Sequence, residues 1–332
     1  MAEVFVTGHL NPDTDSICSA LAFASYQQAI GQPAIAVRAG SISPETQWIL
    51  DRFKVTAPPL IRDLRTQIQD LKLDTPRPLT AHVPLRKAWE AMRQTKVKSI
   101  PVVDHDDKLV GIVSLGDLAE FDLAAETVHA IQMPAENLVD MLNAKVSGTL
   151  PKHFQASYFW FNEHDKIPAK SNVFVDKLSA DLIGQAVASR ASCVVLCAGN
   201  GADISKLPPP DLAEMAEKVG MPILVTAMRP YYAIRYAQQA VPIKVFMKSD
   251  KLMVFKAEDF VDDVRESMLS TRFRSYPVVD SDDRVIGTIS RYHLLQPGRK
   301  QVMLVDHNER SQAVRGIEQA EILAIIDHHR LG

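Results

Sequence analysis

The chain has 332 residues, of which 46% are hydrophobic and 23% are charged, and its formal net charge is −3. This length predicts two or more domains, and the balanced composition excludes an intrinsically disordered chain. No basic run supports nucleic-acid binding, and three cysteines cannot form a disulfide framework. The sequence shows neither a secretory signal nor a long apolar run, so we expect a cytoplasmic protein with no membrane partner.

A strand–helix–strand pattern opens the chain. Short β-branched runs predict strands over 4–7 and 34–38, and an apolar helical repeat predicts a helix over 17–30. Alternation at this spacing is typical of a parallel sheet with helices on its faces.

A segment of twenty residues occurs twice farther along the chain. Residues 99–118 read SIPVVDHDDKLVGIVSLGDL, residues 275–294 read SYPVVDSDDRVIGTISRYHL, and ten of the twenty positions are identical. Unrelated segments would share about one residue, at roughly a twentieth per position. Each copy follows an amphipathic helix and predicts a unit of helix, strand, turn, strand and helix. The unit resembles the CBS module, which works as a pair and binds adenine nucleotides between its copies; the resemblance covers 72–123 and 243–297.

The segment between the two copies alternates helical and buried-strand patterns, which predicts β/α units. Its position and its α/β pattern resemble the DRTGG domain of some regulated pyrophosphatases. The expected helices cover 180–189, 210–219 and 231–239, and the expected strands cover 192–196 and 222–226.

The end of the chain returns to the pattern of its beginning. Strands are predicted over 301–305 and 322–326, with a helix over 310–317 between them. Both ends of the chain are therefore expected to build one parallel sheet, with the insert leaving and rejoining at a loop.

Three polar segments follow predicted strands. They read GHLNPDTDS from residue 8, VDHNE from residue 305 and DHHR from residue 327. Because the C-terminal ends of parallel strands meet at one edge of a sheet, we expect these segments to converge. Converging carboxylates repel one another unless a cation lies between them. Imidazole and carboxylate groups without a thiolate favour Mn²⁺, Co²⁺ or Zn²⁺ over calcium.

The three segments resemble the DHH phosphoesterase superfamily and, within it, the family II inorganic pyrophosphatases. The resemblance implies hydrolysis of pyrophosphate to two phosphates with two Mn²⁺ or Co²⁺ ions, with Mg²⁺ as a further candidate. It implies that His9, Asp13 and Asp306 hold one ion. Asp15, Asp306 and His328 would hold the other ion.

Three more side chains are expected around the substrate. The resemblance implies that His329 faces a phosphate and that Asp327 orients its neighbours. His307 either contacts phosphate or anchors its loop. The implied chemistry is attack on phosphorus by a bridging water whose pKa both cations lower.

The resulting fold class is α/β, with a parallel-sheet DHH domain interrupted by a regulatory insert. In the insert, two CBS motifs flank the DRTGG-like domain. We assign 1–70 and 299–332 to the DHH domain, 71–123 to the first CBS motif, 124–242 to the DRTGG-like domain and 243–298 to the second CBS motif.

Nucleotide contacts are expected in both CBS motifs. The family's ribose-phosphate contact has Ser or Thr three residues before Asp, and Ser114 and Asp117 fit it. In the second copy Ser290 is kept, but His293 stands where the Asp would be.

Three other side chains have two possible roles each. Tyr276 could stack on adenine or pack within its strand, and Lys98 and Arg274 could contact phosphate or be solvated. The resemblance implies AMP, ADP, ATP or a diadenosine polyphosphate as the regulator, and CBS pairing across two chains implies a homodimer.

Three functions are left open. The first is the regulated pyrophosphatase, and the second is a catalytically inactive adenine-nucleotide sensor. The third is a DHH phosphoesterase of short nucleic acids or dinucleotides, which the PDTDS wording and the CBS insert disfavour. The sequence ends directly after DHHRLG, before the further aspartate ligand and the Ser-Arg-Lys phosphate clamp that the resemblance implies. We therefore expect a truncated chain with poor turnover.

Overall fold

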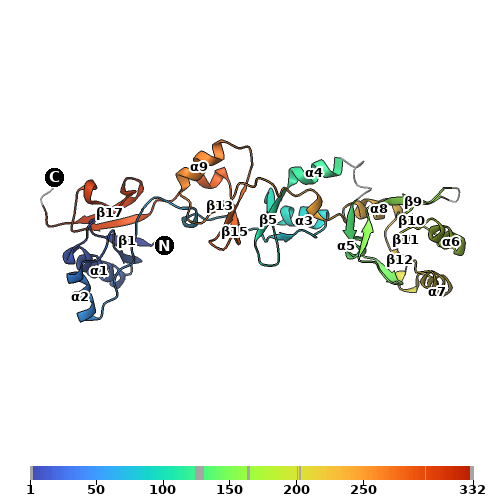
Figure 1. Ribbon diagram of the computed structural model, residues 1–332, viewed down its shortest axis with the longest axis horizontal. Coiled ribbons are helices and arrows are strands. Elements are labelled where there is room, and N and C mark those ends of the chain that lie inside the picture. The colour runs from blue at the N-terminus through green and yellow to red at the C-terminus, as the bar shows by residue number, and fades with distance from the viewer. Residues whose placement is uncertain are drawn as a thin grey trace. The chain divides into compact units, whose positions relative to one another are not determined.

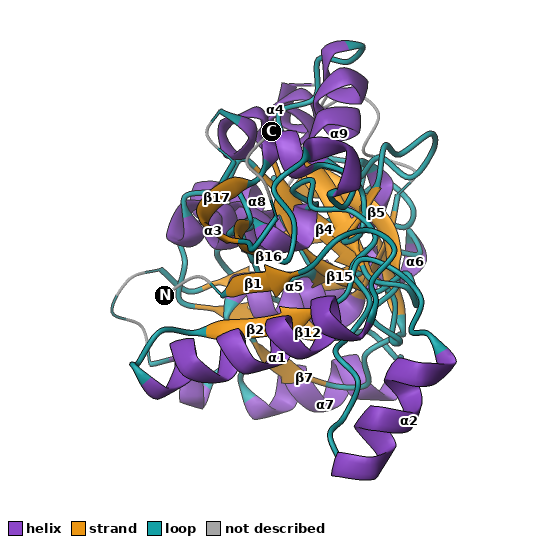
Figure 2. Ribbon diagram, turned by 90° about the vertical axis from the view of Figure 1, so that its left-hand side faces the viewer, coloured by secondary structure: helices purple, strands orange, loops and turns teal. Residues whose placement is uncertain are grey.

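The chain forms two units, and each combines helices with strands (Figures 1 and 2). The first contains Met1–Leu73, Phe255–Phe273 and Ile289–Gly332, and the second contains Asp74–Val254 and Arg274–Thr288. This architecture confirms the predicted α/β class. The computed structural model describes residues 3–123, 131–162, 165–199, 201, 203–295 and 297–329.

The first unit contains a parallel sheet with the strand order β17-β16-β1-β2. Its elements are β1 (Val4–Thr7), α1 (Thr14–Ala29), β2 (Ala34–Val37), α2 (Pro44–Phe53), a 3₁₀ turn (Ile68–Asp70), β13 (Phe255–Lys256), α9 (Val261–Leu269), a 3₁₀ turn (Arg291–Leu294), β16 (Gln301–Val305), two 3₁₀ turns (Arg310–Gln312 and Ile317–Gln319) and β17 (Glu321–Ile326).

Strands from opposite ends of the chain lie side by side in this sheet. Val4 of β1 pairs with Ala34 on one side and with Gln301 on the other. The blue and red ribbons of Figure 1 accordingly share one unit. The four strands begin and end within one residue of the predicted bounds, so the expectation that the two ends build one sheet is confirmed.

Alternate residues of β16 face opposite sides of the sheet. Met303 and Val305 are buried in a cluster with α1, whereas Val302 and Leu304 are buried in a cluster that includes residues of the 313–320 segment. The sheet is therefore covered on both faces at β16, and the 313–320 segment packs against one of these faces.

The predicted helix over 310–317 is wrong, because this segment forms two separate 3₁₀ turns. Gly316 between them has a φ of 81°, in the left-handed region. A β-carbon on Gly316 would lie 2.6 Å from Asp63 Oδ1 and 2.7 Å from the Arg65 amide nitrogen. The backbone at Gly316 thus lies too close to residues 63–65 to carry a side chain at this position.

The second unit contains three sheets with the strand orders β7-β12-β11-β10-β9, β3-β4-β5 and β6-β8, and the pair β14-β15. Its elements are β3 (Leu79–Thr80), α3 (Leu85–Thr95), β4 (Ser99–Val103), β5 (Leu109–Ser114), α4 (Leu115–Leu123), β6 (Gln132–Pro134), α5 (Ala135–Leu142), β7 (Lys145–Ser147), β8 (His153–Gln155), β9 (Tyr158–Trp160), β10 (Asn172–Val175), α6 (Ala180–Ala188), β11 (Cys193–Cys197), a 3₁₀ turn (Ile204–Lys206), α7 (Pro210–Lys218), β12 (Ile223–Thr226), α8 (Pro230–Gln238), a 3₁₀ turn (Ile243–Val245), β14 (Tyr276–Val279) and β15 (Val285–Ile289).

The five-stranded sheet has helices on both faces. One buried cluster joins α5 and α8 to residues such as Phe174 and Val195, and the other joins α6 and α7 to Val173 and Val194. The β/α pattern predicted for this segment is therefore confirmed. Burial raises the pKa of the Cys197 thiol to about 12, as expected of a core residue.

The helices before the two repeat copies are buried in the same register. Leu85, Ala88 and Met92 face the core in α3, and their counterparts 176 residues later, Val261 and Val264 among them, do so in α9. The closing helices differ, because α4 is an α-helix and its counterpart, Arg291–Leu294, is only a 3₁₀ turn. Pro297 and Gly298 lie shortly after this turn and are poor helix formers.

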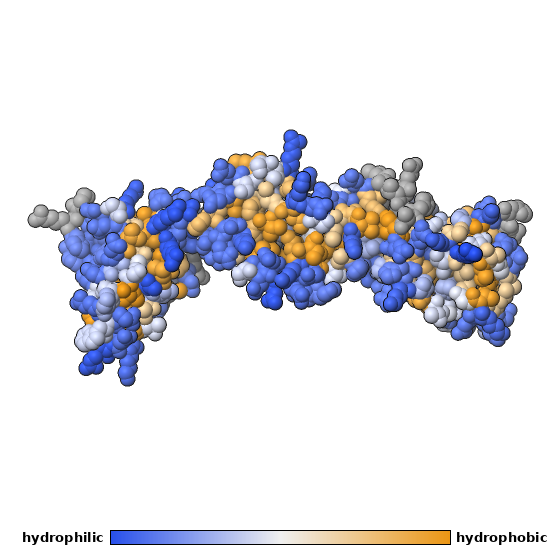
Figure 3. Space-filling model, viewed as in Figure 1, coloured by the Kyte–Doolittle hydropathy of each residue, from blue (hydrophilic) through white to orange (hydrophobic). Residues whose placement is uncertain are grey.

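The surface mixes hydrophobic and hydrophilic residues on the face seen in Figure 3. In the part of the chain that the structure describes, no helix is both long and apolar enough to cross a membrane. Strand β17 leaves Ile322, Leu323, Ile325 and Ile326 each at least 40% exposed.

Candidate metal centre

The loop between β1 and α1 is held by its own side chains. Asp13 is the N-cap of α1 and accepts a hydrogen bond of 3.0 Å from the Ser16 amide through Oδ1. Ser16 Oγ in turn accepts the His9 amide at 3.0 Å. Gly8 must be glycine for this packing, because a β-carbon there would lie 1.7 Å from Ser16 Oγ. Helix α1 begins three residues before the predicted start. Its first turn orients the polar loop through the contacts of Asp13 and Ser16.

Asp306 lies directly after β16, in an uncommon backbone conformation. Its φ is 60°, and its amide donates to the Ile326 carbonyl at 2.9 Å. The left-handed region costs a residue with a side chain about 1–2 kcal/mol. Its side chain is 5% exposed. A buried carboxylate on a strained backbone is typical of a functional position.

Asp306 lies between two groups of polar side chains. His9 Nε2 is 3.4 Å from Asp306 Oδ2 and 3.9 Å from Asp13 Oδ1. His328 Nδ1 is 3.9 Å from Asp306 Oδ1 and 3.9 Å from Asp15 Oδ2. The structure therefore brings together the five residues that the sequence suggests as metal ligands, with Asp306 common to both groups.

The carboxylate of Asp327 contacts both His329 and Asn308. Its Oδ1 is 2.7 Å from His329 Nδ1, and its Oδ2 accepts the Asn308 Nδ2 amide at 2.6 Å. The rings of His328 and His329 are stacked, with centroids 4.2 Å apart. Asn308 was missed in the sequence, although it belongs to the VDHNE segment.

The electrostatics of the cluster favour a cation. Burial and the nearby carboxylates of Asp15 and Asp13 raise the pKa of Asp306. Burial opposes ionisation of Asp327 too, but hydrogen bonds from His329 lower its pKa, and the same contact raises the pKa of His329. The cluster therefore combines carboxylates that repel one another with imidazoles that can bind a metal.

Two sets of these side chains can place one ligand atom each within 4.8 Å of the others: His9, Asp13 and Asp306 form one, and Asp306, Asp327, His328 and His329 form the other. Asp15, which the sequence suggests for the second ion, is in neither set, although its Oδ2 is 3.9 Å from His328 Nδ1. Mixed nitrogen and oxygen ligands suit Mn²⁺, Co²⁺ or Zn²⁺, so the residues fit divalent ions.

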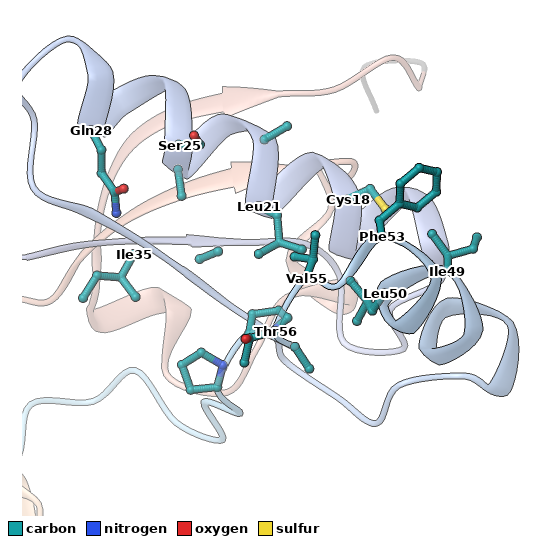
Figure 4. A pocket seen from close by; sticks show the side chains of 16 residues that line it. Cys18, Leu21, Ser25, Gln28, Ile35, Ile49, Leu50, Phe53, Val55 and Thr56 are labelled. Atoms are coloured by element: carbon teal, nitrogen blue, oxygen red, sulfur yellow. The ribbon is translucent and has the colours of Figure 1, made fainter.

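His307 lies beneath this cluster and is 1% exposed. Its Nδ1 is 3.1 Å from the Val305 carbonyl oxygen, and burial lowers its pKa. It lines the same cavity as the cluster, a space of about 560 Å³. A larger cavity of about 860 Å³ lies between α1, α2 and β2 (Figure 4), and the residues that line it carry no charged group. The charged side chains and the imidazoles therefore line the smaller cavity and not the larger one.

Comparison with known proteins identifies the family. The family model described as "DHH family, N-terminal domain" matches residues 3–332. The chain belongs to the DHH family.

Curated relatives of this DHH-family chain include two pyrophosphatases. It is 32% identical to the cobalt-dependent inorganic pyrophosphatase of Clostridium perfringens over 342 residues, which cover 99% of this chain and 60% of the relative. It is 30% identical to the probable manganese-dependent inorganic pyrophosphatase of Thermotoga maritima over 352 residues, which cover 100% of this chain and 61% of the relative. The chain thus spans about 60% of the length of these relatives.

A solved structure is similar in fold to part of this DHH-family chain. It holds the CBS and DRTGG domains of the regulatory region of Clostridium perfringens pyrophosphatase, complexed with the activator diadenosine tetraphosphate. The match has a TM-score of 0.58 at 24% identity and covers 68% of this chain and 100% of the other. The CBS and DRTGG folds expected from the sequence are therefore shown.

The candidate ribose contacts of the two CBS copies have the same local geometry. The Ser114 amide and hydroxyl donate to Asp117 Oδ2 at 2.8 and 2.6 Å. In the second copy the Ser290 amide donates to His293 Nδ1 at 3.1 Å. Lys248 Nζ, which was missed in the sequence, is 3.4 Å from Asp117 Oδ1. An imidazole thus replaces the carboxylate in the second copy.

The other three nucleotide candidates differ in exposure. Tyr276 is 1% exposed in β14 and packs within the core, which matches the strand-packing alternative. Lys98 and Arg274 are exposed, as either of their two possible roles requires.

Proposed function

We propose that this chain carries the metal centre and the regulatory region of an inorganic pyrophosphatase that hydrolyses pyrophosphate to two phosphates. The observation that carries the proposal is the position of Asp306 between the His9–Asp13 and His328–Asp15 pairs. The pyrophosphatases of Clostridium perfringens and Thermotoga maritima support the substrate.

In the proposed site, His9, Asp13 and Asp306 hold one Mn²⁺ or Co²⁺ ion, and Asp15, Asp306 and His328 hold the other. When bound, such a pair would lower the pKa of a water molecule and neutralise charge on the phosphoryl group.

The side chains around the ions position the substrate. Asp327 accepts hydrogen bonds from Asn308 and His329 and so fixes the His329 ring. Because this contact raises the pKa of His329, the imidazole carries its second proton more readily and can donate it to a phosphate oxygen.

The proposed regulation acts through the CBS pair. AMP, ADP, ATP or a diadenosine polyphosphate would bind there, with Ser114 and Asp117 on a ribose and with Ser290, Lys98 and Arg274 as further contacts. The related Clostridium perfringens region, which binds diadenosine tetraphosphate, supports this class of ligand. Tyr276 would approach an adenine only if its strand opened.

The proposed division of the chain follows the sequence, with DHH segments 1–70 and 299–332, CBS motifs 71–123 and 243–298, and the DRTGG-like domain 124–242. We also propose a cytoplasmic homodimer, because CBS modules commonly pair across two chains.

The test combines two assays on the purified chain. Phosphate release from pyrophosphate with Mn²⁺ or Co²⁺ measures hydrolysis, and calorimetric titration with AMP and ATP measures nucleotide binding. Metal-dependent phosphate release that Asp306→Asn abolishes would support the enzyme. Nucleotide binding without hydrolysis would favour the sensor, and hydrolysis of short nucleic acids or dinucleotides instead would favour another DHH phosphoesterase.

A further inference from the structure

The proton of His307 can be placed from its contacts. Nδ1 lies 3.1 Å from the Val305 carbonyl oxygen, and a carbonyl oxygen can only accept a hydrogen bond. Nδ1 therefore carries the proton, and in the neutral ring Nε2 has a lone pair and is an acceptor. This Nε2 is buried and, among the described residues, has no hydrogen-bond partner. A buried acceptor of this kind is uncommon in a folded protein.

A complementary donor lies on the neighbouring histidine. His9 turns Nε2 towards the carboxylates of Asp306 and Asp13, at 3.4 and 3.9 Å. If Nε2 binds the metal, as the proposed function requires, the neutral ring carries its proton on Nδ1. A metal-binding histidine normally donates that proton to an acceptor.

The two rings are placed for such a contact. The ring centroids of His9 and His307 are 6.5 Å apart and their planes are nearly perpendicular, at 88°. The next residue, Asn308, donates an Nδ2 proton to Asp327 at 2.6 Å. The lone pair of His307 and the proton of His9 are therefore matched in chemistry and belong to neighbouring rings.

We propose that His307 Nε2 accepts the Nδ1 proton of His9 in the metal-loaded site, directly or through one water molecule. His307 is then a positioning residue that fixes the tautomer and orientation of a metal ligand. This inference rests on the proposed metal site and assigns His307 a contact with His9 in place of one with phosphate.

Two variants separate this role from packing. In His307→Asn the amide reaches only as far as Nδ1, so it can keep the contact with Val305 but leaves no acceptor at the Nε2 position. In His307→Gln the amide reaches as far as Nε2 and keeps an acceptor there. Both remove the ring, so they share the loss of packing.

We expect His307→Asn to weaken Mn²⁺ binding about 10–100-fold, the usual effect of removing such a partner, and His307→Gln to retain most of the affinity. Calorimetric Mn²⁺ titration measures both, and circular dichroism without metal checks folding. Equal weakening in the two variants, or no weakening in His307→Asn, would overturn the proposal. A parent chain that binds no divalent cation would overturn it together with the proposed function.

Nuclear magnetic resonance gives a second readout, which depends on neither turnover nor metal. Long-range ¹H–¹⁵N spectra of the metal-free chain, assigned by the signal missing in His307→Asn, report which nitrogen is protonated. We expect the proton on Nδ1, and a proton on Nε2 would overturn the proposal. If the parent binds Mn²⁺ with the expected variant pattern but releases no phosphate, the proposed function fails and this inference stands.

Discussion

The contact between Gly8 and Ser16 makes Gly8→Ala a sensitive probe of the loop that carries His9. A β-carbon on Gly8 would lie 1.7 Å from Ser16 Oγ and 2.9 Å from Ser16 Cβ. Contacts this short do not occur, so Ser16, which is 1% exposed, must move. The movement breaks the 3.0 Å hydrogen bond from the His9 amide.

The magnitude follows from these two effects. The lost hydrogen bond is worth about 0.5–1.5 kcal/mol, and overpacking costs about 1–3 kcal/mol. We expect Gly8→Ala to lower the free energy of unfolding by about 2–4 kcal/mol. Ser16→Ala loses the hydrogen bond without overpacking and should lower it by about 1 kcal/mol. The double variant should lose less than the sum, because both changes remove one hydrogen bond and Ser16→Ala also removes the colliding oxygen.

The assay must report the first unit alone. Urea unfolding of the metal-free chain, followed by hydrogen exchange in peptides from β1 and α1, meets this need. Calorimetric Mn²⁺ titration of the same variants shows whether the moved His9 also weakens metal binding. The reasoning is refuted if the two single losses simply add in the double variant, or if Gly8→Ala unfolds at the same urea concentration as the parent.

Three further variants test the metal centre, the fold and the nucleotide site. Since the pKa of Asp306 is raised above its ordinary 3.8, its carboxyl group stabilises the metal-free chain at low pH and this contribution is lost as the pH rises through the raised pKa. Without metal at pH 7, Asp306→Asn should therefore have a free energy of unfolding at least as high as that of the parent, and the difference should grow as the pH rises from 4. In thermal melts with Mn²⁺, the variant should lose the stabilisation that the metal gives the parent. Gly316→Ala should lower the free energy of unfolding in urea by about 2–5 kcal/mol, because the left-handed φ and the contact with Asp63 both disfavour a side chain. Gly31 is the control, because its φ is 84° and the space around it is open. Gly31→Ala should cost only about 1–2 kcal/mol. Asp117→Asn should weaken AMP binding in calorimetry by about 1.5–3 kcal/mol, and Asp140→Ala, an exposed control that pairs with Lys87 at 2.9 Å, should leave it unchanged.

Much of the fold follows from patterns that neighbouring residues carry. The strands were predictable because they are short, continuous apolar runs, such as Cys193–Cys197, which is buried throughout. The helices of the second unit were predictable because their buried sides repeat about every 3.6 residues. The second repeat copy was predictable in the same way, since Val261 and Val264 repeat the spacing of Leu85 and Ala88. Local patterns suffice where the apolar residues form a continuous run or repeat along one helix face.

The failures depend on contacts between distant residues. The segment that contains Gly316 has helical spacing, but Gly316 adopts a left-handed φ and lies against Asp63 and Arg65, which are far away in sequence. Lys248 reaches Asp117 from a different segment. The sequence named the residues of the metal cluster through a resemblance. The contact of Asn308 with Asp327 required coordinates, and so did the buried Nε2 of His307, which has no hydrogen-bond partner in the part of the chain that the structure describes.

The register of β16 decides whether the cluster can form at all. Leu304 pairs with Thr7 on one side, and Val305 pairs with Ile326 on the other. Asp306 therefore leaves the sheet level with both the loop after β1 and the start of the Asp327 segment. A slip of one residue in either pairing would turn the side chains of β16 to the opposite faces. Burial of Val302 and Leu304 on one face, and of Met303 and Val305 on the other, thus also positions the carboxylate that the proposed chemistry requires.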